Sequence, residues 1–339
     1  MVRGFVTDSS ASAGVRLAAD LPEPEPDGEL VVEVRAFAIN RGELSLLEQR
    51  PDGWRPGQDV AGVVNRTAAD GSGPRKGARV VGIVDGASWA ERVAVPVHRV
   101  ASLPDGVDFS SAASLPIAGL TALRALRIGG PLLGRRVLVT GATGGVGQFA
   151  VQLAAAGGAR VTAQVSASAR EQEAYDLGAD EVATSLDDEA LGPFDLVLDG
   201  VGGPVLHAAV HRLAPGGTAA LYGVGGGPAE LALPDFVSAP LAKVLGFFVH
   251  AGPEEELGAD LATLAGSSPT GASTLTSGWC ATGRRRRASS TPFANAACGA
   301  RPSSPGADPR CSTTSRPRRS RPPAARSTRG WAETGPRAQ

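Results

Sequence analysis

The sequence predicts an α/β protein whose main domain is a doubly wound parallel sheet, preceded by a smaller β-rich domain. Three observations lead to this fold class. An apolar strand passes directly into a glycine-rich turn and then into a helix at residues 135–156. Strands and helices then alternate up to about residue 249. The composition changes sharply after residue 266, where we expect a tail without a core.

The amino-terminal part consists of short strand-like runs separated by turns rich in glycine, proline and aspartate. These runs lie at residues 29–38, 60–65, 78–84 and 91–95. Short runs with such turns between them are typical of antiparallel sheets, so we expect a compact β-barrel-like domain over residues 1–117. An apolar segment at residues 115–126 then crosses into a second domain, which we place at residues 118–266.

The glycine-rich turn has the pattern of a dinucleotide-binding site. Residues 137–139 suit a buried parallel strand, and residues 149–154 are apolar at helical spacing. The G-x-G-x-x-G pattern between them, with alanine at the first glycine, is made by Ala142, Thr143, Gly144, Gly145, Val146 and Gly147. Free amide groups and the helix dipole there favour a pyrophosphate. A plain glycine-rich surface loop is the alternative, which the strand-turn-helix context disfavours.

The rest of the second domain supports this interpretation. Further strands are expected at residues 160–165, 194–199, 218–222 and 243–249, and a helix at 167–177. The ligand of such a sheet lies at the carboxyl ends of its strands, where Gly144, Gly202 and Gly223 all fall.

The second strand of this domain favours NADP(H) over NAD(H). An NAD site usually carries an acidic residue here for the ribose hydroxyl, but residues 164–166 contain none. Ser166 offers a hydroxyl and Arg170 a guanidinium for a 2′-phosphate. Alternatively, Ser166 caps the helix and Arg170 is a solvated charge.

Residues 267–339 differ from everything before them. They hold 13 Lys plus Arg against 2 Asp plus Glu, whereas residues 1–266 hold 20 against 32. They contain a single leucine, Leu275, and no valine or isoleucine, so we expect disorder. Our leading hypothesis is an out-of-frame translation, because the shifted codons permit an ordinary helix and strand here. Sequencing the gene across Gly266 tests this hypothesis.

The three cysteines, Cys280, Cys298 and Cys311, all lie in this tail. A disulfide framework is therefore excluded for residues 1–266, and the tail spacing does not make a zinc site. We expect neither a signal peptide nor a membrane span, and hence a cytoplasmic protein.

Several segments together carry a family resemblance. They read AFAINRGEL at 36–44, PGQDVAGVV at 56–64, GASWAERVAV at 86–95, LPIAGLTAL at 115–123, the glycine turn, DGVGG at 199–203 and LAPGGTAALYG at 213–223. They resemble the medium-chain dehydrogenase/reductase superfamily, specifically its zinc-independent quinone oxidoreductase branch. The resemblance covers residues 1–266 and implies a GroES-like amino-terminal domain and a Rossmann sheet. It also makes a homodimer through residues 243–249 plausible.

The chain departs from the zinc-dependent members of that superfamily. They have a cysteine near the segment at 40–43 and Gly-His-Glu where this chain has Gly57, Gln58 and Asp59. We therefore expect no metal and no zinc. His207 and His211 have helical spacing, but we find no carboxylate or third ligand for them in the sequence. Glu43 and Asp59 are interpreted as solvated loop charges, which leaves no clear acid-base residue.

The resemblance implies hydride transfer to a quinone or to the β-carbon of an α,β-unsaturated carbonyl. It places Asn40 and Thr121 at the nicotinamide end of the site and brings the backbone of Gly200, Val201, Gly202 and Gly223 against the cofactor. Phe247 and Phe248 would wall the substrate pocket. The alternatives are that Asn40 caps a turn, that Thr121 sits within a helix, and that the phenylalanines belong to the core.

Three functions remain open. The first is a zinc-independent, NADPH-dependent reductase of quinones or enones. The second is an NADPH-binding pseudoenzyme inactivated by loss of the native carboxyl terminus, which would expose a sheet edge. The third, which we disfavour, is nucleic-acid binding through the basic tail.

Overall fold

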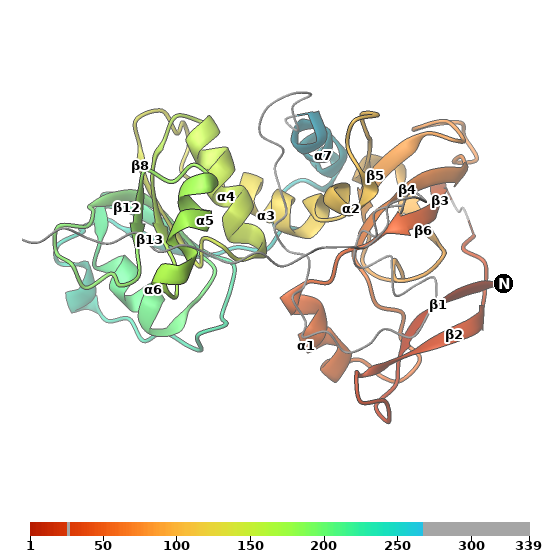
Figure 1. The fold of residues 1–339 in the computed structure, drawn as a ribbon, viewed down its shortest axis with the longest axis horizontal. Helices are drawn as coiled ribbons and strands as arrows, with labels where there is room; N and C mark the ends of the chain where they lie inside the picture. Colours follow the sequence, from red (N-terminus) through yellow and green to blue (C-terminus); the bar gives the residue numbers. More distant parts are fainter. Residues whose placement is uncertain (26–27, 267–339) are drawn as a thin grey trace, which may run out of the picture. The chain divides into compact units, whose positions relative to one another are not determined.

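The computed structural model describes residues 1–25 and 28–266, so the predictions for residues 267–339 lie outside the described residues. The described chain contains two larger sheets and one small one, labelled in Figure 1. Within these residues, no helix is both long and apolar enough to cross a bilayer.

The amino-terminal region forms an antiparallel sheet of five strands in the order β6-β3-β4-β5-β7. The strands are β3 (Glu29–Ala36), β4 (Asp59–Arg66), β5 (Arg79–Ile83), β6 (Arg92–Pro96) and β7 (Val100–Ser102). Leu30 and Val32 of β3 share a buried cluster with Val80 and Val95 of neighbouring strands. The expected strands are therefore present, and a small sheet of β1 (Val2–Thr7) and β2 (Val15–Leu21) accompanies them.

The crossover predicted at residues 115–126 is helical. A π-helical turn η2 (Leu115–Gly119) passes directly into α3 (Leu120–Ile128), and α2 (Phe109–Ala112) precedes both. Six of the nine residues of α3 are buried, and the helix packs against the first helix of the second sheet.

The second sheet has six parallel strands in the order β10-β9-β8-β11-β12-β13. The strands are β8 (Arg136–Thr140), β9 (Arg160–Gln164), β10 (Glu181–Ala183), β11 (Phe194–Asp199), β12 (Leu213–Leu221) and β13 (Lys243–Gly246). Numbered from β8 along the chain, this order is 3-2-1-4-5-6, that of a dinucleotide-binding Rossmann sheet. The prediction of a doubly wound parallel sheet is confirmed.

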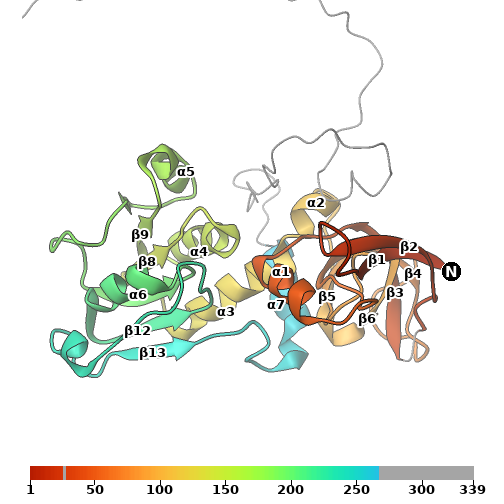
Figure 2. The same cartoon turned by 90° about the horizontal axis from the view of Figure 1, so that it is seen from below.

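Helices cover both faces of this sheet, as Figure 2 shows from below. Val137 and Val139 of β8 share a buried cluster with residues of α4 (Gly145–Ala156) and α5 (Glu171–Asp176). Leu138, which points to the opposite face, shares another cluster with α6 (Gly203–Val210). The strand needs apolar residues at every position because each face is covered.

The remaining elements are short or lie where no element was predicted. They are α1 (Arg41–Gln49), η1 (Val97–Arg99), η3 (Ser168–Arg170), η4 (Leu233–Phe236), η5 (Glu254–Glu256) and α7 (Leu257–Gly266). The helix expected at 167–177 is divided between η3 and α5. β12 begins at Leu213, five residues before the predicted start at 218, and its pairing with β11 is irregular near the Pro215-Gly216-Gly217 turn.

Candidate functional site

The predicted dinucleotide turn joins β8 to α4 at the carboxyl edge of the six-stranded sheet. A side-chain carbon at position 147 would lie 2.3 Å from the carbonyl oxygen of Gly141, so only glycine allows α4 to start this close to the turn. At position 145 nothing lies within 4 Å of such a carbon. The first amide to bond within α4 is Gln148 N, to Gly144 O at 3.0 Å. The preceding amides at the start of α4 therefore suit an anion.

A buried carboxylate ties this turn to the loop that follows β11. Thr140 Oγ1 donates to Asp199 Oδ1 at 2.6 Å, and Asp199 Oδ2 accepts the Gly202 amide at 2.8 Å. The Gly200 amide in turn donates to Thr140 Oγ1 at 3.1 Å. Burial raises the pKa of Asp199 above its ordinary value. The two loops are thus held in one arrangement by groups that the sequence analysis did not single out.

The loop after β12 lies against the same place. A side-chain carbon at position 223 would lie 2.2 Å from the Gly200 carbonyl oxygen, so the two backbones approach as only glycine permits. The Gly226 amide donates to Val201 O at 2.6 Å. Gly200, Val201, Gly202 and Gly223 are therefore brought together, next to the turn at 141–147.

Tyr222 packs against this group of loops. Its ring lies against Gly200, and its buried hydroxyl has no hydrogen-bond partner among the described residues. Burial, and secondarily the charge of Asp199, raise the pKa of Tyr222. The hydroxyl is therefore neutral at physiological pH.

Arg170 reaches the glycine turn from the segment after β9. Its Nη1 donates to Thr143 Oγ1 at 2.9 Å, which brings two of the predicted cofactor residues together. Ser166 is exposed, and the residue that precedes η3 as its cap is Ala167. Ser166 therefore does not cap this helical turn.

Asn40, at the start of α1, lies in a network with two buried acids. Its Nδ2 donates to Asp59 Oδ2 at 2.7 Å, and its backbone amide donates to Glu43 Oε2 at 2.7 Å. Glu43 Oε1 accepts the Gln58 amide at 2.8 Å. The interpretation of Glu43 and Asp59 as solvated loop charges is wrong, since each is 0% exposed.

The same network reaches Thr121. Asp59 Oδ1 accepts the Ile117 amide at 2.8 Å, and the Ile117 carbonyl accepts Thr121 Oγ1 at 2.6 Å. Asn40 and Thr121, predicted from different parts of the chain, are thus connected through Asp59 and one residue of η2. Thr121 is buried within a helix, as the alternative interpretation held.

Burial governs the protonation of the two acids. It raises the pKa of Glu43 to about 7, and the pKa of Asp59, which also faces the Glu43 charge, to about 8. Two carboxylates that share Asn40 repel each other when both are ionised, so the pair retains a proton near neutral pH. The arrangement can therefore hold or release a proton inside the amino-terminal domain.

The two phenylalanines predicted to wall the substrate pocket differ from each other. Phe247 is 9% exposed and belongs to a hydrophobic core, whereas Phe248 is 77% exposed. Both follow the end of β13 rather than lying within it. Phe247 therefore lies in the core, as the alternative interpretation held.

The histidine pair has a carboxylate beside it that the sequence did not suggest. Asp235, from η4, lies 3.2 Å from His211 Nε2 through its Oδ1. The expectation that no carboxylate accompanies His207 and His211 is wrong, because η4 is distant along the chain but adjacent in the fold.

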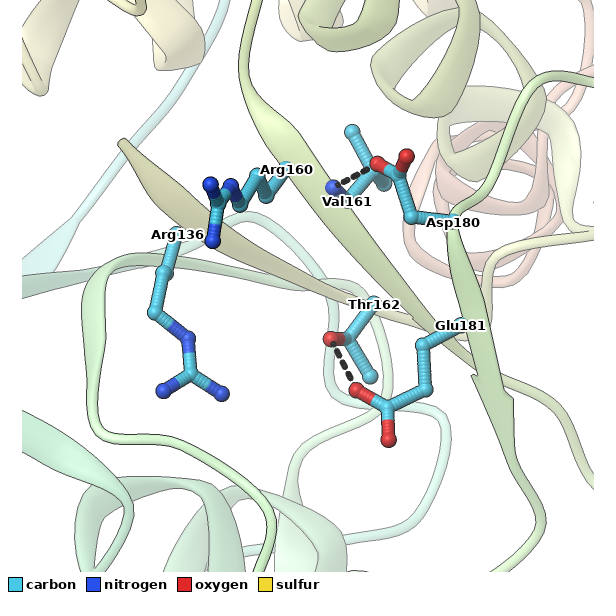
Figure 3. Close-up of a pocket in the computed structure, with 6 residues that line it drawn as sticks. All are labelled: Arg136, Arg160, Val161, Thr162, Asp180 and Glu181. Atoms are coloured by element: carbon cyan, nitrogen blue, oxygen red, sulfur yellow. Dashed lines mark hydrogen bonds between the residues drawn. The ribbon is translucent and has the colours of Figure 1, made fainter. Parts of the chain in front are cut away.

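One hollow of about 340 Å³ lies elsewhere on the sheet (Figure 3). Arg136 and Arg160 begin β8 and β9, so the hollow is at the amino end of these strands. Asp180 and Glu181 line it too, and they accept hydrogen bonds from the Val161 amide and from Thr162 Oγ1. The predicted cofactor residues are at the opposite, carboxyl end, so this hollow is a separate feature.

Comparison with known proteins agrees with this architecture. The model of the alcohol dehydrogenase GroES-like domain matches residues 26–105, and that of the zinc-binding dehydrogenase family matches residues 145–265. Together they span more than half of the chain.

Solved structures of similar fold include a mycobacterial quinone oxidoreductase, with a TM-score of 0.69 and 27% identity over 79% of this chain and 89% of that chain. A mycobacterial protein in complex with NADPH gives a TM-score of 0.68 and 26% identity, over 79% of this chain and 88% of the other.

Curated relatives include a highly reducing polyketide synthase of Arthrinium phaeospermum, 33% identical over 58% of this chain and 9% of the synthase. The chain spans about half or less of the length of the curated relatives that it matches first. With a GroES-like domain, a Rossmann sheet and these structural neighbours, the chain belongs to the medium-chain dehydrogenase/reductase superfamily.

Proposed function

We propose that the protein is an NADPH-dependent, zinc-independent oxidoreductase that reduces quinones or α,β-unsaturated carbonyls by hydride transfer. The observation that carries the proposal is the convergence of three glycine loops, at 141–147, 200–203 and 223–226, on the carboxyl edge of the sheet. A structural neighbour with the same fold is a complex with NADPH. The bound nicotinamide would supply the hydride, and the protein would orient and polarise the substrate.

The preference for NADP(H) is proposed from the end of β9. Gln164 Oε1 accepts the Gly141 amide at 3.1 Å, so this side chain braces the turn and offers no carboxylate to a ribose. The Arg170 guanidinium, held at Thr143, supplies positive charge beside the turn. A guanidinium in this position suits a 2′-phosphate.

Zinc independence is proposed from the donor set around Asn40. Zinc sites in proteins use thiolates, imidazoles and carboxylates that are free to bind the ion. Here Asn40 and Gln58 stand where the zinc-dependent relatives are expected to have ligands, and Glu43 and Asp59 already accept two or more hydrogen bonds each. This set does not fit a zinc ion, so we assign none to the reaction.

Asn40 and Thr121 are proposed to face the reacting end of the site, with Asp59 as the positioning residue that holds Asn40. The Glu43 and Asp59 pair can hold a proton near neutral pH and is connected to Asn40 by hydrogen bonds. A carbonyl compound reduced at its β-carbon must gain a proton at the α-carbon, and a pair of acids that holds a proton near the site can supply it.

We further propose a cytoplasmic homodimer.

Purified full-length chain tests the proposal in two steps. Titration with NADPH, followed by fluorescence, measures binding, and NADPH oxidation is then recorded with a panel of quinones and a panel of cyclic and acyclic enones. Saturable binding with turnover of either class, retained after dialysis against EDTA, supports the proposal. Binding with no turnover supports the pseudoenzyme instead. A folded chain that binds neither reduced coenzyme would falsify both.

A further inference from the structure

We propose that His207, His211 and Asp235 form a surface site for a divalent transition-metal ion, away from the proposed hydride-transfer site and independent of its function. His207 lies on α6, His211 follows its last turn, and Asp235 comes from η4. One potential ligand atom from each side chain lies within 4.8 Å of the others. Two imidazoles and a carboxylate make a ligand set that zinc, nickel and copper accept.

The orientation of His207 leaves one ring nitrogen free for a metal. Its Nδ1 lies 3.0 Å from the carbonyl oxygen of Glu230. A carbonyl can only accept, so Nδ1 carries the hydrogen and Nε2 keeps its lone pair. A histidine ligand whose other nitrogen donates to a carbonyl is the usual arrangement around protein-bound metals.

Asp235 is oriented in the same manner. Its Oδ2 accepts the backbone amide of Ala232 at 2.7 Å, which leaves Oδ1 directed at His211. Oδ1 and His211 Nε2 are 3.2 Å apart. Two ligand atoms bound at about 2.0–2.1 Å to one tetrahedral ion are roughly 3.3 Å apart. Asp235 Oδ1 and His211 Nε2 would therefore need to move little to bind the same ion.

The ion would fasten the segment after β12 to α6. His207 and His211 lie at the carboxyl end of α6, while the amino end of that helix follows Gly202. The connecting segment is already bonded near that end, through the Gly226 amide and Val201 O at 2.6 Å. Metal binding would strengthen the attachment at the other end of the helix, where His207 and His211 already contact Glu230 and Asp235. Since binding to the folded state alone stabilises it, Zn²⁺ should raise the unfolding midpoint.

The experiment uses untagged full-length chain with its three cysteines alkylated, because Cys280, Cys298 and Cys311 are also potential ligands. Titration calorimetry with Zn²⁺ and Ni²⁺ compares the wild type with His207→Ala, His211→Ala and Asp235→Asn. His98→Ala, which removes another surface histidine, is the matched control. The His211 side chain is 41% exposed, so its removal should leave the fold intact.

We expect one equivalent of either ion to bind the wild type and the His98 variant alike. Affinity should fall at least about tenfold in each histidine variant, since even losing a group that only orients a ligand costs that much, and by less in the Asp235 variant. The rise in unfolding midpoint with Zn²⁺ should disappear in parallel. Equal binding by the wild type and the histidine variants, or no saturable binding by the wild type, overturns the site. Neither result bears on NADPH oxidation.

Discussion

At the scale of single residues, the buried acids make the stability of the chain depend on pH. Burial raises the pKa of Glu43 to about 7 and that of Asp59 to about 8. The folded chain therefore binds more protons than the unfolded chain above the ordinary carboxyl range, and the free energy of unfolding falls as the pH rises. We expect a fall between about pH 5 and about pH 8, at up to about 1.4 kcal/mol per pH unit for each retained proton.

Replacing one acid should flatten this dependence. In Asp59→Asn one titrating group is lost, and Glu43 no longer faces a second charge. Urea unfolding at three pH values checks this expectation, with Asp20→Asn as a control because Asp20 is exposed. If the free energy of unfolding of the Asp59 variant falls with pH as steeply as that of the wild type, Glu43 and Asp59 do not retain a proton as a pair.

In the proposed function, Arg170 is the residue that favours NADPH over NADH. A hydrogen bond to a charged group contributes about 1.5–3 kcal/mol, so Arg170→Gln should weaken NADPH binding by about tenfold or more and leave NADH binding nearly unchanged. Arg160→Gln removes the same charge at the opposite end of β9 and is the matched control. Dissociation constants for both coenzymes give the measurement, and an equal loss for NADPH and NADH refutes the role.

The residues found from sequence alone were those that follow a local pattern. The turn at 142–147 is recognisable because glycine spacing and flanking apolar runs occur within twenty residues of each other. Glu43 and Asp59 are separated from each other by sixteen positions, and Asp59 is contacted by Asn40 and by Ile117 of η2, which come from other parts of the chain. A clue was present, since Asp59 opens an apolar strand, where a solvated acid is out of place.

At the scale of elements, α7 is attached to α3 by a buried ion pair. Arg124 Nε lies 2.7 Å from Asp260 Oδ2, and its other nitrogens donate to the carbonyls of Val249 and Pro253. Removing Asp260 leaves a buried guanidinium without its carboxylate. We therefore expect Asp260→Ala to lower the free energy of unfolding by about 3–5 kcal/mol in denaturant titrations.

Arg127 provides the comparison for that substitution. It contacts the other oxygen of Asp260 at 2.6 Å, but its side chain is 49% exposed, so Arg127→Ala should cost about 1 kcal/mol or less. Similar losses in Arg127→Ala and Asp260→Ala would show that burial of the pair contributes nothing.

Strands were easier to predict than helices in this chain. β8 and β11 contain uninterrupted apolar runs, at 137–139 and 196–198, because helices cover both faces of the sheet. α1 was missed because only Glu43 of its residues is buried, so its sequence shows no apolar stripe. α7 was missed as well, although its leucines at 257, 261 and 264 have helical spacing and are fully buried.

At the scale of the whole molecule, β13 lies at the edge of the six-stranded sheet and, among the described residues, pairs with β12 alone. Leu241, Leu245 and Phe248 on and beside it are 88%, 40% and 77% exposed. An open strand edge with exposed apolar side chains is a surface that proteins normally cover. In the proposed homodimer, a second copy of the chain paired through β13 would cover the same residues on both subunits, as a two-fold interface requires.

The proposed homodimer makes a prediction about mass in solution. Leu245→Lys places a charge on the edge strand. Natural sheets use such charges to avoid edge-to-edge pairing with other chains, so this substitution should convert a dimer into a monomer. Leu17→Lys is the control. Leu17 is 42% exposed, about as much as Leu245, but it lies on β2. Size-exclusion chromatography with light scattering measures the mass of each. If the wild type is already a monomer, or if the Leu245 variant remains a dimer, pairing through β13 is wrong, and the exposed leucines of that edge need another partner.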